Sequence, residues 1–211
     1  MMVYIIVFVS LPVLVFQSGD GLFRSAILRL LLLFCTIGLV VGAAIYLDKR
    51  PLQEYGLELD CRWMSNLLAG FVIGGAIPTV AVLLGVVGGW ITVGGTGYSL
   101  TASYLRDVGL AIVIIMSIAV VEELVFRGYV LTNALEGLDL RGVSTTTTIV
   151  GAWSVSGLLF AFVHPAPTLV AGLHFLSSGL LLGLAYLVSG QLGLPIGSTP
   201  GSTSSLGTSF R

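Results

Sequence analysis

The chain has 211 residues, of which 56% are hydrophobic and only 9% are charged, and its mean hydropathy is +1.06. A typical soluble domain carries about 25% charged residues, so this composition excludes a water-soluble globular enzyme and a disordered chain. The net charge of −1 offers no basic surface for nucleic acid. Cys35 and Cys61 show no paired spacing that would indicate a disulfide framework or a thiolate zinc site. We therefore expect a polytopic membrane protein.

Six apolar stretches are candidates for membrane-spanning helices, which need about 20 mainly apolar residues each. The stretches are 2–16, 26–47, 66–93, 108–130, 145–163 and 168–188, and 192–197 opens a seventh helix. The first is short, but no positive residues precede it and no small-x-small cleavage site follows, so we interpret it as a retained helix rather than a signal peptide. Continuous apolar stretches favour helices over a β-barrel. The sequence predicts an all-α membrane protein, a bundle of about six transmembrane helices plus the start of a seventh.

Residues 1–197 are predicted to form one polytopic membrane domain, and the polar tail 198–211 is expected to be disordered or out of frame. Two glycine pairs, Gly70/Gly74 and Gly85/Gly89, have the GxxxG spacing that lets helices approach closely in lipid. Glycine is also simply common in membrane helices. Basic residues divide unevenly between the two sides, and the positive-inside rule then places the N-terminus in the cytoplasm of a multi-pass protein, with the cell membrane as its expected location. They are Lys49, Arg50, Arg62 and Arg141 on one side, and Arg24, Arg29 and Arg106 on the other.

The most informative stretch is Glu122-Glu123-x-x-x-Arg127, at the expected end of an apolar helix. Carboxylates inside a membrane helix are costly, about 3 kcal/mol each, and need partners or a wet cavity. Glu123 and Arg127 are four residues apart and lie on one helical face, so they are expected to pair. Glu122 points about 100° away from Glu123. A free carboxylate in a desolvated site has a raised pKa and serves well as a general base. The alternative is an ordinary ion-pair cluster at a helix end.

A second polar position follows in Phe160-x-x-x-His164, where the histidine closes an apolar stretch and precedes Pro165. Its imidazole is suited to hold a water molecule beside a carboxylate or to bind a metal. The alternative is a histidine that caps a helix C-terminus. His174, the other histidine of the chain, is interpreted as a packed or interfacial residue.

Together, Glu122-Glu123-x-x-x-Arg127 and Phe160-x-x-x-His164 resemble the first two motifs of the CPBP family of intramembrane proteases. This family includes the CAAX prenyl proteases and the bacteriocin-processing and bacteriocin-immunity (abortive-infection) proteins. The resemblance covers about 108–197, including the segment 190–197, which is similar to the family's approach to its last motif. It implies an intramembrane endopeptidase acting on a peptide or protein substrate at the lipid bilayer.

The resemblance also implies roles for individual residues. Glu122 would activate the attacking water, and His164 would position or deprotonate it. Glu123 and Arg127 would hold the helix end in shape. Phe160 would pack beside His164, where it is the residue we assign to substrate binding.

The family's third motif, His-x-x-x-Asn, is missing, because positions 199–203 read Thr-Pro-Gly-Ser-Thr. Every threonine codon begins with AC, so reading one base earlier turns it into a codon for Tyr, His, Asn or Asp. Thr199 and Thr203 have the spacing of the missing motif, and we hypothesise a one-base slip near Ser198. The codons of Ser198 and Ser202 must end in C and A for this to hold, and a natural divergent terminus is the alternative. Either way, we expect this chain to be a weak or inactive enzyme.

Metal dependence stays open at this stage. A catalytic zinc usually takes three protein ligands, whereas only Glu122 and His164 are well placed, and the chain has no HExxH motif. We therefore favour a glutamate-activated water, with a divalent metal such as zinc as the alternative. Two other functions compete with the protease. One is a non-catalytic membrane binding or bacteriocin-immunity protein, and the other is a small transporter, which the scarcity of polar residues on the other helices disfavours.

Overall fold

The computed structural model describes residues 22–92 and 101–202, and all regular structure in these ranges is helical. Five segments in them are long and apolar enough to cross a membrane. They are Ala26–Asp48, Cys61–Val87, Ala102–Gly137, Thr145–Val163 and Leu169–Ser189. The predicted all-α membrane architecture is confirmed. The remaining predicted span, 2–16, lies outside the described residues.

The longest element is a rod of three consecutive helical segments, which are α4 (Ala102–Glu123), the π-helical η3 (Leu124–Leu131) and α5 (Thr132–Gly137). The threonine that precedes it caps the rod, since its hydroxyl accepts from the Tyr104 amide. The α-helix α4 ends at the two glutamates, as expected, but the wider turns of η3 carry the rod on without a break. The glutamates therefore lie about 30 Å from the start of a rod about 54 Å long.

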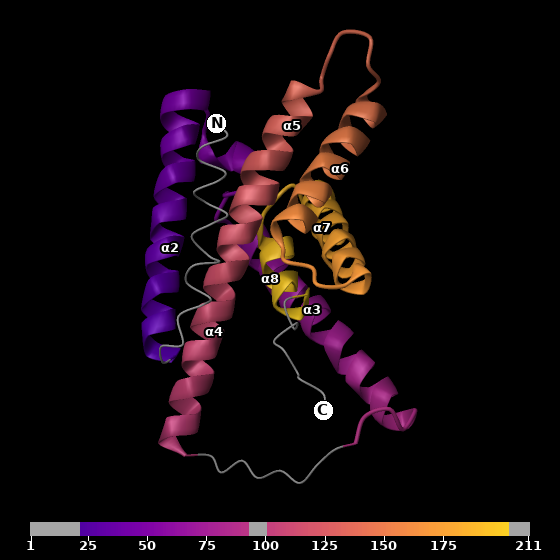
Figure 1. Cartoon of the computed structure of the whole chain (residues 1–211). Helices are drawn as coiled ribbons and strands as arrows, with labels where there is room; N and C mark the ends of the chain where they lie inside the picture. The colour runs from indigo at the N-terminus through magenta and orange to yellow at the C-terminus, as the bar shows by residue number, and fades with distance from the viewer. Residues whose placement is uncertain (1–21, 93–100, 203–211) are drawn as a thin grey trace.

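Helix α2 (Leu22–Gly42), with its π-helical continuation η1 (Ala43–Asp48), packs against this rod. The two run side by side in the same direction, as the colour gradient in Figure 1 shows. This contact brings a helix from outside the region of family resemblance against the rod that carries the two glutamates.

The closest helix contact lies between α3 (Cys61–Val87) and α8 (Gly193–Ser202), and glycine makes it possible. A methyl group on Gly70 would lie 2.3 Å from the carbonyl oxygen of Leu194, and one on Gly197 would lie 2.2 Å from that of Leu67. Gly70 and Gly74 thus act as the GxxxG spacing predicts. The second pair does not join two of the described helices, because α3 ends at Val87 and the turn after it folds back on Gly85.

Helix α8 does not stop at the expected boundary of the tail. It continues through residues 198–202, and Ser198 donates to the carbonyl of Leu194 one turn earlier. Residues 203–211 lie outside the described part of the chain, so the disorder expected there stays a prediction. As Figure 1 shows, α8 lies between α3 and the rod.

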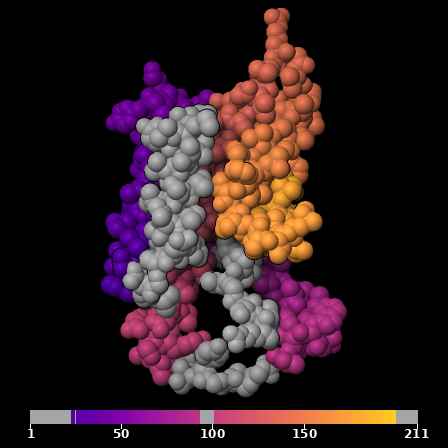
Figure 2. Space-filling model, in the orientation of Figure 1, coloured from indigo at the N-terminus to yellow at the C-terminus, as the bar shows by residue number. Residues whose placement is uncertain are grey.

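Helices α6 (Thr145–Val163) and α7 (Leu169–Ser189) form an antiparallel hairpin with a short connection. Gly157 and Gly179 allow close packing, since a methyl group on Gly179 would lie 2.9 Å from the Gly157 carbonyl oxygen. Trp153 also donates its indole N–H to the Leu180 carbonyl at 2.8 Å. Figure 2 shows the hairpin as one packed body, whereas the far end of α3 and the start of α4 stand apart. The hairpin sets where the loop after α6 meets the rod.

The polar segment between α2 and α3 folds onto the helices instead of hanging free. It contains the short 3₁₀ helix η2 (Leu52–Tyr55), and Tyr55 is fully buried with its hydroxyl donating to Asp48 at 2.6 Å. Gly56, at a φ of +76°, accepts from the Leu192 amide at 3.0 Å. This bond fixes the start of α8 and hence the position of the residues that α8 carries.

Candidate active site

The two nitrogens of the His164 ring make different contacts, and the difference decides what the ring can do. Nδ1 lies 2.6 Å from the Phe160 carbonyl oxygen, and because a carbonyl only accepts, Nδ1 carries a hydrogen. Nε2 faces Oε1 of Glu122 at 3.4 Å. In the neutral ring Nε2 presents a lone pair, as does the carboxylate oxygen, so the contact is attractive only with one proton between them. The pair is built to hold a single proton.

One carboxylate oxygen of the Glu122–His164 pair has no protein donor among the described residues. Oε2 of Glu122 is buried and accepts from no protein donor among the described residues. The Glu122 and His164 side chains are 16% and 20% exposed, so the pair is recessed without being sealed. Burial alone would lower the pKa of His164, but the hydrogen bond and the charge of Glu122 outweigh it and raise the pKa above its ordinary 6.5. A small polar molecule in this recess can donate a hydrogen bond to Oε2 of Glu122, next to the His164 imidazole.

Glu123 has a different environment, although it is the next residue. Its Oε1 accepts from Nη1 of Arg127 at 2.9 Å, and both side chains are 0% exposed. Nη2 of Arg127 donates to the Gly179 carbonyl at 3.0 Å, which ties the rod to α7. The ion pair expected from the spacing of four residues is present, and its arginine also binds α7.

The ring of Phe160 lies beneath this cluster. It is 2% exposed, stands edge-on to Phe126 with 5.2 Å between ring centres, and supports the Arg127 guanidinium 4.5 Å above its face. Its carbonyl holds His164, as described above. The substrate-binding role expected for Phe160 stays a prediction, and its burial favours a supporting role.

Helix α6 is fastened to the rod next to the site. Ser156 donates its hydroxyl to the Phe126 carbonyl in η3 at 2.9 Å. His164 follows about two turns later, directly after the last helical residue of α6. Two hydrogen bonds therefore fix the histidine, since the Ser156 hydroxyl holds α6 against the rod and the Phe160 carbonyl holds the imidazole ring.

Two site neighbours were missed by the sequence reasoning. Phe175 of α7 stacks on the His164 ring at 4.7 Å with an angle of 27° between the planes. Thr199 of α8 is 0% exposed, and its single hydroxyl hydrogen is shared between Oε1 of Glu123 at 3.1 Å and the Pro195 carbonyl oxygen at 2.8 Å. The short link between α6 and α7 is the sequence feature that indicates that Phe175 lies near His164. Thr199 is indicated by its position, which is that of the third-motif histidine in the family resemblance.

A metal does not fit the described residues. They contain no group of three or more His, Cys, Asp and Glu side chains that could hold an ion. Glu122 and His164 supply two donors, and the neighbouring carboxylate, Glu123, is taken by Arg127 and Thr199. A catalytic zinc usually takes three protein ligands, so no chemistry is assigned to a metal here.

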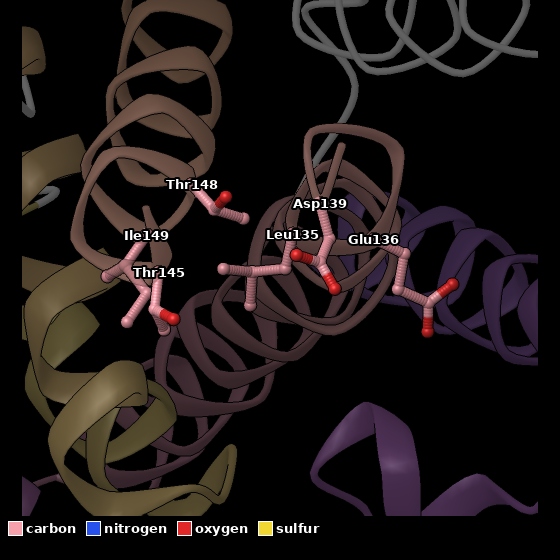
Figure 3. Close-up of a pocket in the computed structure, with 6 residues that line it drawn as sticks. All are labelled: Leu135, Glu136, Asp139, Thr145, Thr148 and Ile149. Carbon is pink, nitrogen blue, oxygen red and sulfur yellow. The ribbon is translucent and has the colours of Figure 1, made fainter. Parts of the chain in front are cut away.

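A separate hollow lies at the tip of the α5–α6 hairpin, and Figure 3 shows the side chains around it. It is lined by Leu135, Glu136, Asp139, Thr145, Thr148 and Ile149. None of the residues of the Glu122–His164 site borders it, and Glu136 is paired with Arg50. The hollow is therefore distinct from the candidate active site.

Comparison with known families identifies the part of the chain that builds this site. Residues 104–198 match the family described as type II CAAX prenyl endopeptidase Rce1-like. Comparison with curated proteins and with solved structures gives no match. The matched segment runs from the start of the rod into α8 and includes both motifs. This match confirms the resemblance to the CPBP proteases for residues 104–198, which are similar to the Rce1-like CAAX prenyl endopeptidases.

Proposed function

We propose that this integral membrane protein is an endopeptidase that hydrolyses a peptide bond with a water molecule activated by Glu122 and His164. The match of residues 104–198 to the CAAX-type protease family supports the reaction class. The observation that carries the mechanism is the contact between Nε2 of His164 and Oε1 of Glu122, with Nδ1 anchored on the Phe160 carbonyl. This arrangement has room for one more proton, which is what a general base needs.

The proton balance of the reaction follows from that pair. The water oxygen attacks the carbonyl carbon of the substrate, and one of its protons passes to the Glu122–His164 pair. The carbon–nitrogen bond of the tetrahedral intermediate then breaks, and the pair returns the proton to the leaving nitrogen. The first step requires the pair to begin without the extra proton, and the second step returns the pair to that state.

The remaining residues act through this pair. Glu123 and Arg127 hold the rod against α7 through the Gly179 carbonyl, which keeps Glu122 facing the histidine. Phe160 holds the tautomer of His164 through its carbonyl. These are positioning roles, and their loss is expected to lower activity by displacing the pair.

Thr199 favours a second, non-catalytic function. In the family the corresponding position carries a histidine that is taken to steady the oxyanion, and here a threonine hydroxyl binds Glu123 instead. Loss of one oxyanion donor typically slows an enzyme by about 10²- to 10³-fold. We therefore expect slow turnover, and a membrane binding or immunity protein that holds a peptide without cleaving it is the alternative.

The test is hydrolysis by the purified full chain in liposomes. The substrates are a farnesylated peptide ending in a CAAX sequence, its unprenylated twin, and a peptide from a transmembrane segment, each followed by mass spectrometry. Glu122→Gln should abolish cleavage, and Glu58→Gln, an exposed glutamate outside the site, should leave it unchanged. Cleavage that survives Glu122→Gln contradicts the mechanism. Tight peptide binding without cleavage by the wild-type chain supports the alternative.

A further inference from the structure

Two aromatic rings from different helices contact the imidazole of His164. Phe160 lies one turn earlier on α6, with 4.4 Å between the ring centres and 35° between the planes. Phe175 comes from α7, on the other side of the link 164–168, with 4.7 Å and 27°. This second pair has the spacing of offset-stacked aromatic rings. The contact with Phe160 is local in the chain, whereas the contact with Phe175 depends on α7 packing back along α6, as Figure 1 shows.

The polar contacts of the imidazole do not fix its orientation by themselves. His164 follows the last helical residue of α6 and has extended backbone angles, φ −93° and ψ 126°, so helix geometry does not set its side chain. The hydrogen bond to the Phe160 carbonyl holds Nδ1, but a single bond still lets the ring turn about it. Nε2 lies 3.4 Å from Oε1 of Glu122, beyond the usual range of about 2.7–3.2 Å. Stacking on the ring face supplies the constraint that these contacts lack, and Phe175 brings it from a second helix.

Helix α7 presents Phe175 from a fixed position. The helix is capped by the threonine that precedes it. Gly179 follows Phe175 by four residues, one turn along the helix, and its carbonyl accepts from Nη2 of Arg127 at 3.0 Å. The shielded arginine of the rod therefore holds the part of α7 from which the Phe175 ring reaches His164.

We propose that Phe175 is a positioning residue of the active site, whose ring stacks on the imidazole of His164 and keeps Nε2 directed toward Glu122. The inference rests on the proposed function for its effect on hydrolysis, but not for the stacking itself. A phenylalanine ring offers no hydrogen-bonding group, so it restrains the imidazole while leaving the Nδ1 hydrogen and the Nε2 lone pair in place. It therefore orients the proton acceptor without competing for the proton.

The stacking is tested first by nuclear magnetic resonance of the full chain in detergent micelles, independently of any substrate. The chain has two histidines, so the ring protons of His164 are identified as those that remain in His174→Gln. The ring current of an aromatic side chain shifts protons above its face upfield. Phe175→Leu should therefore move the His164 signals downfield, and Phe175→Tyr, which keeps the ring, should leave them in place.

The matched control is Phe162→Leu, the same substitution two residues before His164. The Phe162 side chain is 86% exposed, so its loss should leave the His164 signals in place. Signals that stay in place in Phe175→Leu, or that move equally in Phe162→Leu, overturn the proposal.

The catalytic part uses hydrolysis of the farnesylated peptide in liposomes. Phe175→Leu should lower kcat about 2- to 10-fold with KM nearly unchanged, which is the size of effect expected from the loss of one aromatic contact. Phe175→Tyr should keep most of kcat, a rescue that a general loss of folding would not show. An unchanged kcat in Phe175→Leu overturns the positioning role, and so does a loss confined to KM, which would make the ring a substrate contact. Signals that shift in Phe175→Leu, together with a wild-type chain that cleaves none of the test peptides, would show that the proposed function is wrong while the stacking holds.

Discussion

Glu122 and Glu123 are neighbours in the sequence, yet the fold gives them opposite environments. Glu123 is fully shielded and bound to a permanent cation, Arg127. Glu122 is recessed but reachable, and it faces an imidazole that gains and loses its proton near neutral pH. The helical turn of about 100° between them is enough to direct one side chain into the packed interface with α7 and the other toward the end of α6. One carboxylate therefore holds the rod in its packed position, and the other is left facing an imidazole in a recess.

The largest expected effect comes from breaking the shielded pair. Arg127→Met leaves the Glu123 carboxylate buried without its cation, and truncating one partner of such a pair typically costs about 3–5 kcal/mol. Combining Arg127→Met with Glu123→Leu should recover much of that loss, since no buried charge remains. Thermal unfolding in detergent measures both. Equal Tm values for Arg127→Met and wild type would show that Glu123 and Arg127 are not a stabilising pair.

A smaller effect should follow from moving α8, which contacts the shielded Glu123 through Thr199. Gly197→Ala puts a methyl group 2.2 Å from the Leu67 carbonyl oxygen, and overpacking of this kind costs about 1–3 kcal/mol. The shift carries Thr199 away from Glu123. We expect a lower Tm with the pH dependence of hydrolysis unchanged. The control is Gly75→Ala on α3, where no atom lies within 4 Å of the added methyl group. A Tm loss of equal size at Gly75 would remove the steric explanation.

The reachable pair should reveal itself through pH. The pKa of His164 is raised above 6.5 by its contact with Glu122, and the pair acts as a base only when the extra proton is absent. Hydrolysis should therefore increase with pH through a value above 6.5 and fall about tenfold per pH unit below it. Initial rates between pH 5 and 9 provide the measurement. His174→Gln, on exposed α7 surface, serves as the matched control and should keep the profile, whereas a flat profile in the wild type would rule out this proton acceptor.

Sequence reasoning reached the shielded pair and missed part of what surrounds it. The spacing of Glu123 and Arg127 predicts their contact because helix geometry is local. The rod continues to Gly137, past the predicted end of the stretch at 130, because η3 widens the helix without a proline or glycine cluster to signal it. Thr199 and Phe175 were missed since their contacts depend on how α7 and α8 pack, which no periodicity encodes. Local rules fix which groups share a helix face, and only tertiary packing decides what meets that face.

The smallest effect on stability is expected for an arginine–glutamate ion pair that is exposed to water. Arg50 forms a two-armed ion pair with Glu136, but their side chains are 26% and 46% exposed. Exposed ion pairs contribute about 0–1 kcal/mol because water and salt screen them. Arg50→Gln should lower Tm only slightly, and added salt should reduce even that difference, whereas salt should leave the loss in Arg127→Met unchanged. The opposite outcome is a loss of Tm in Arg50→Gln that does not depend on salt and is as large as that in Arg127→Met. It would mean that the polar segment before α3 is as well shielded as the core of the bundle, and that buried and exposed ion pairs do not differ in this protein.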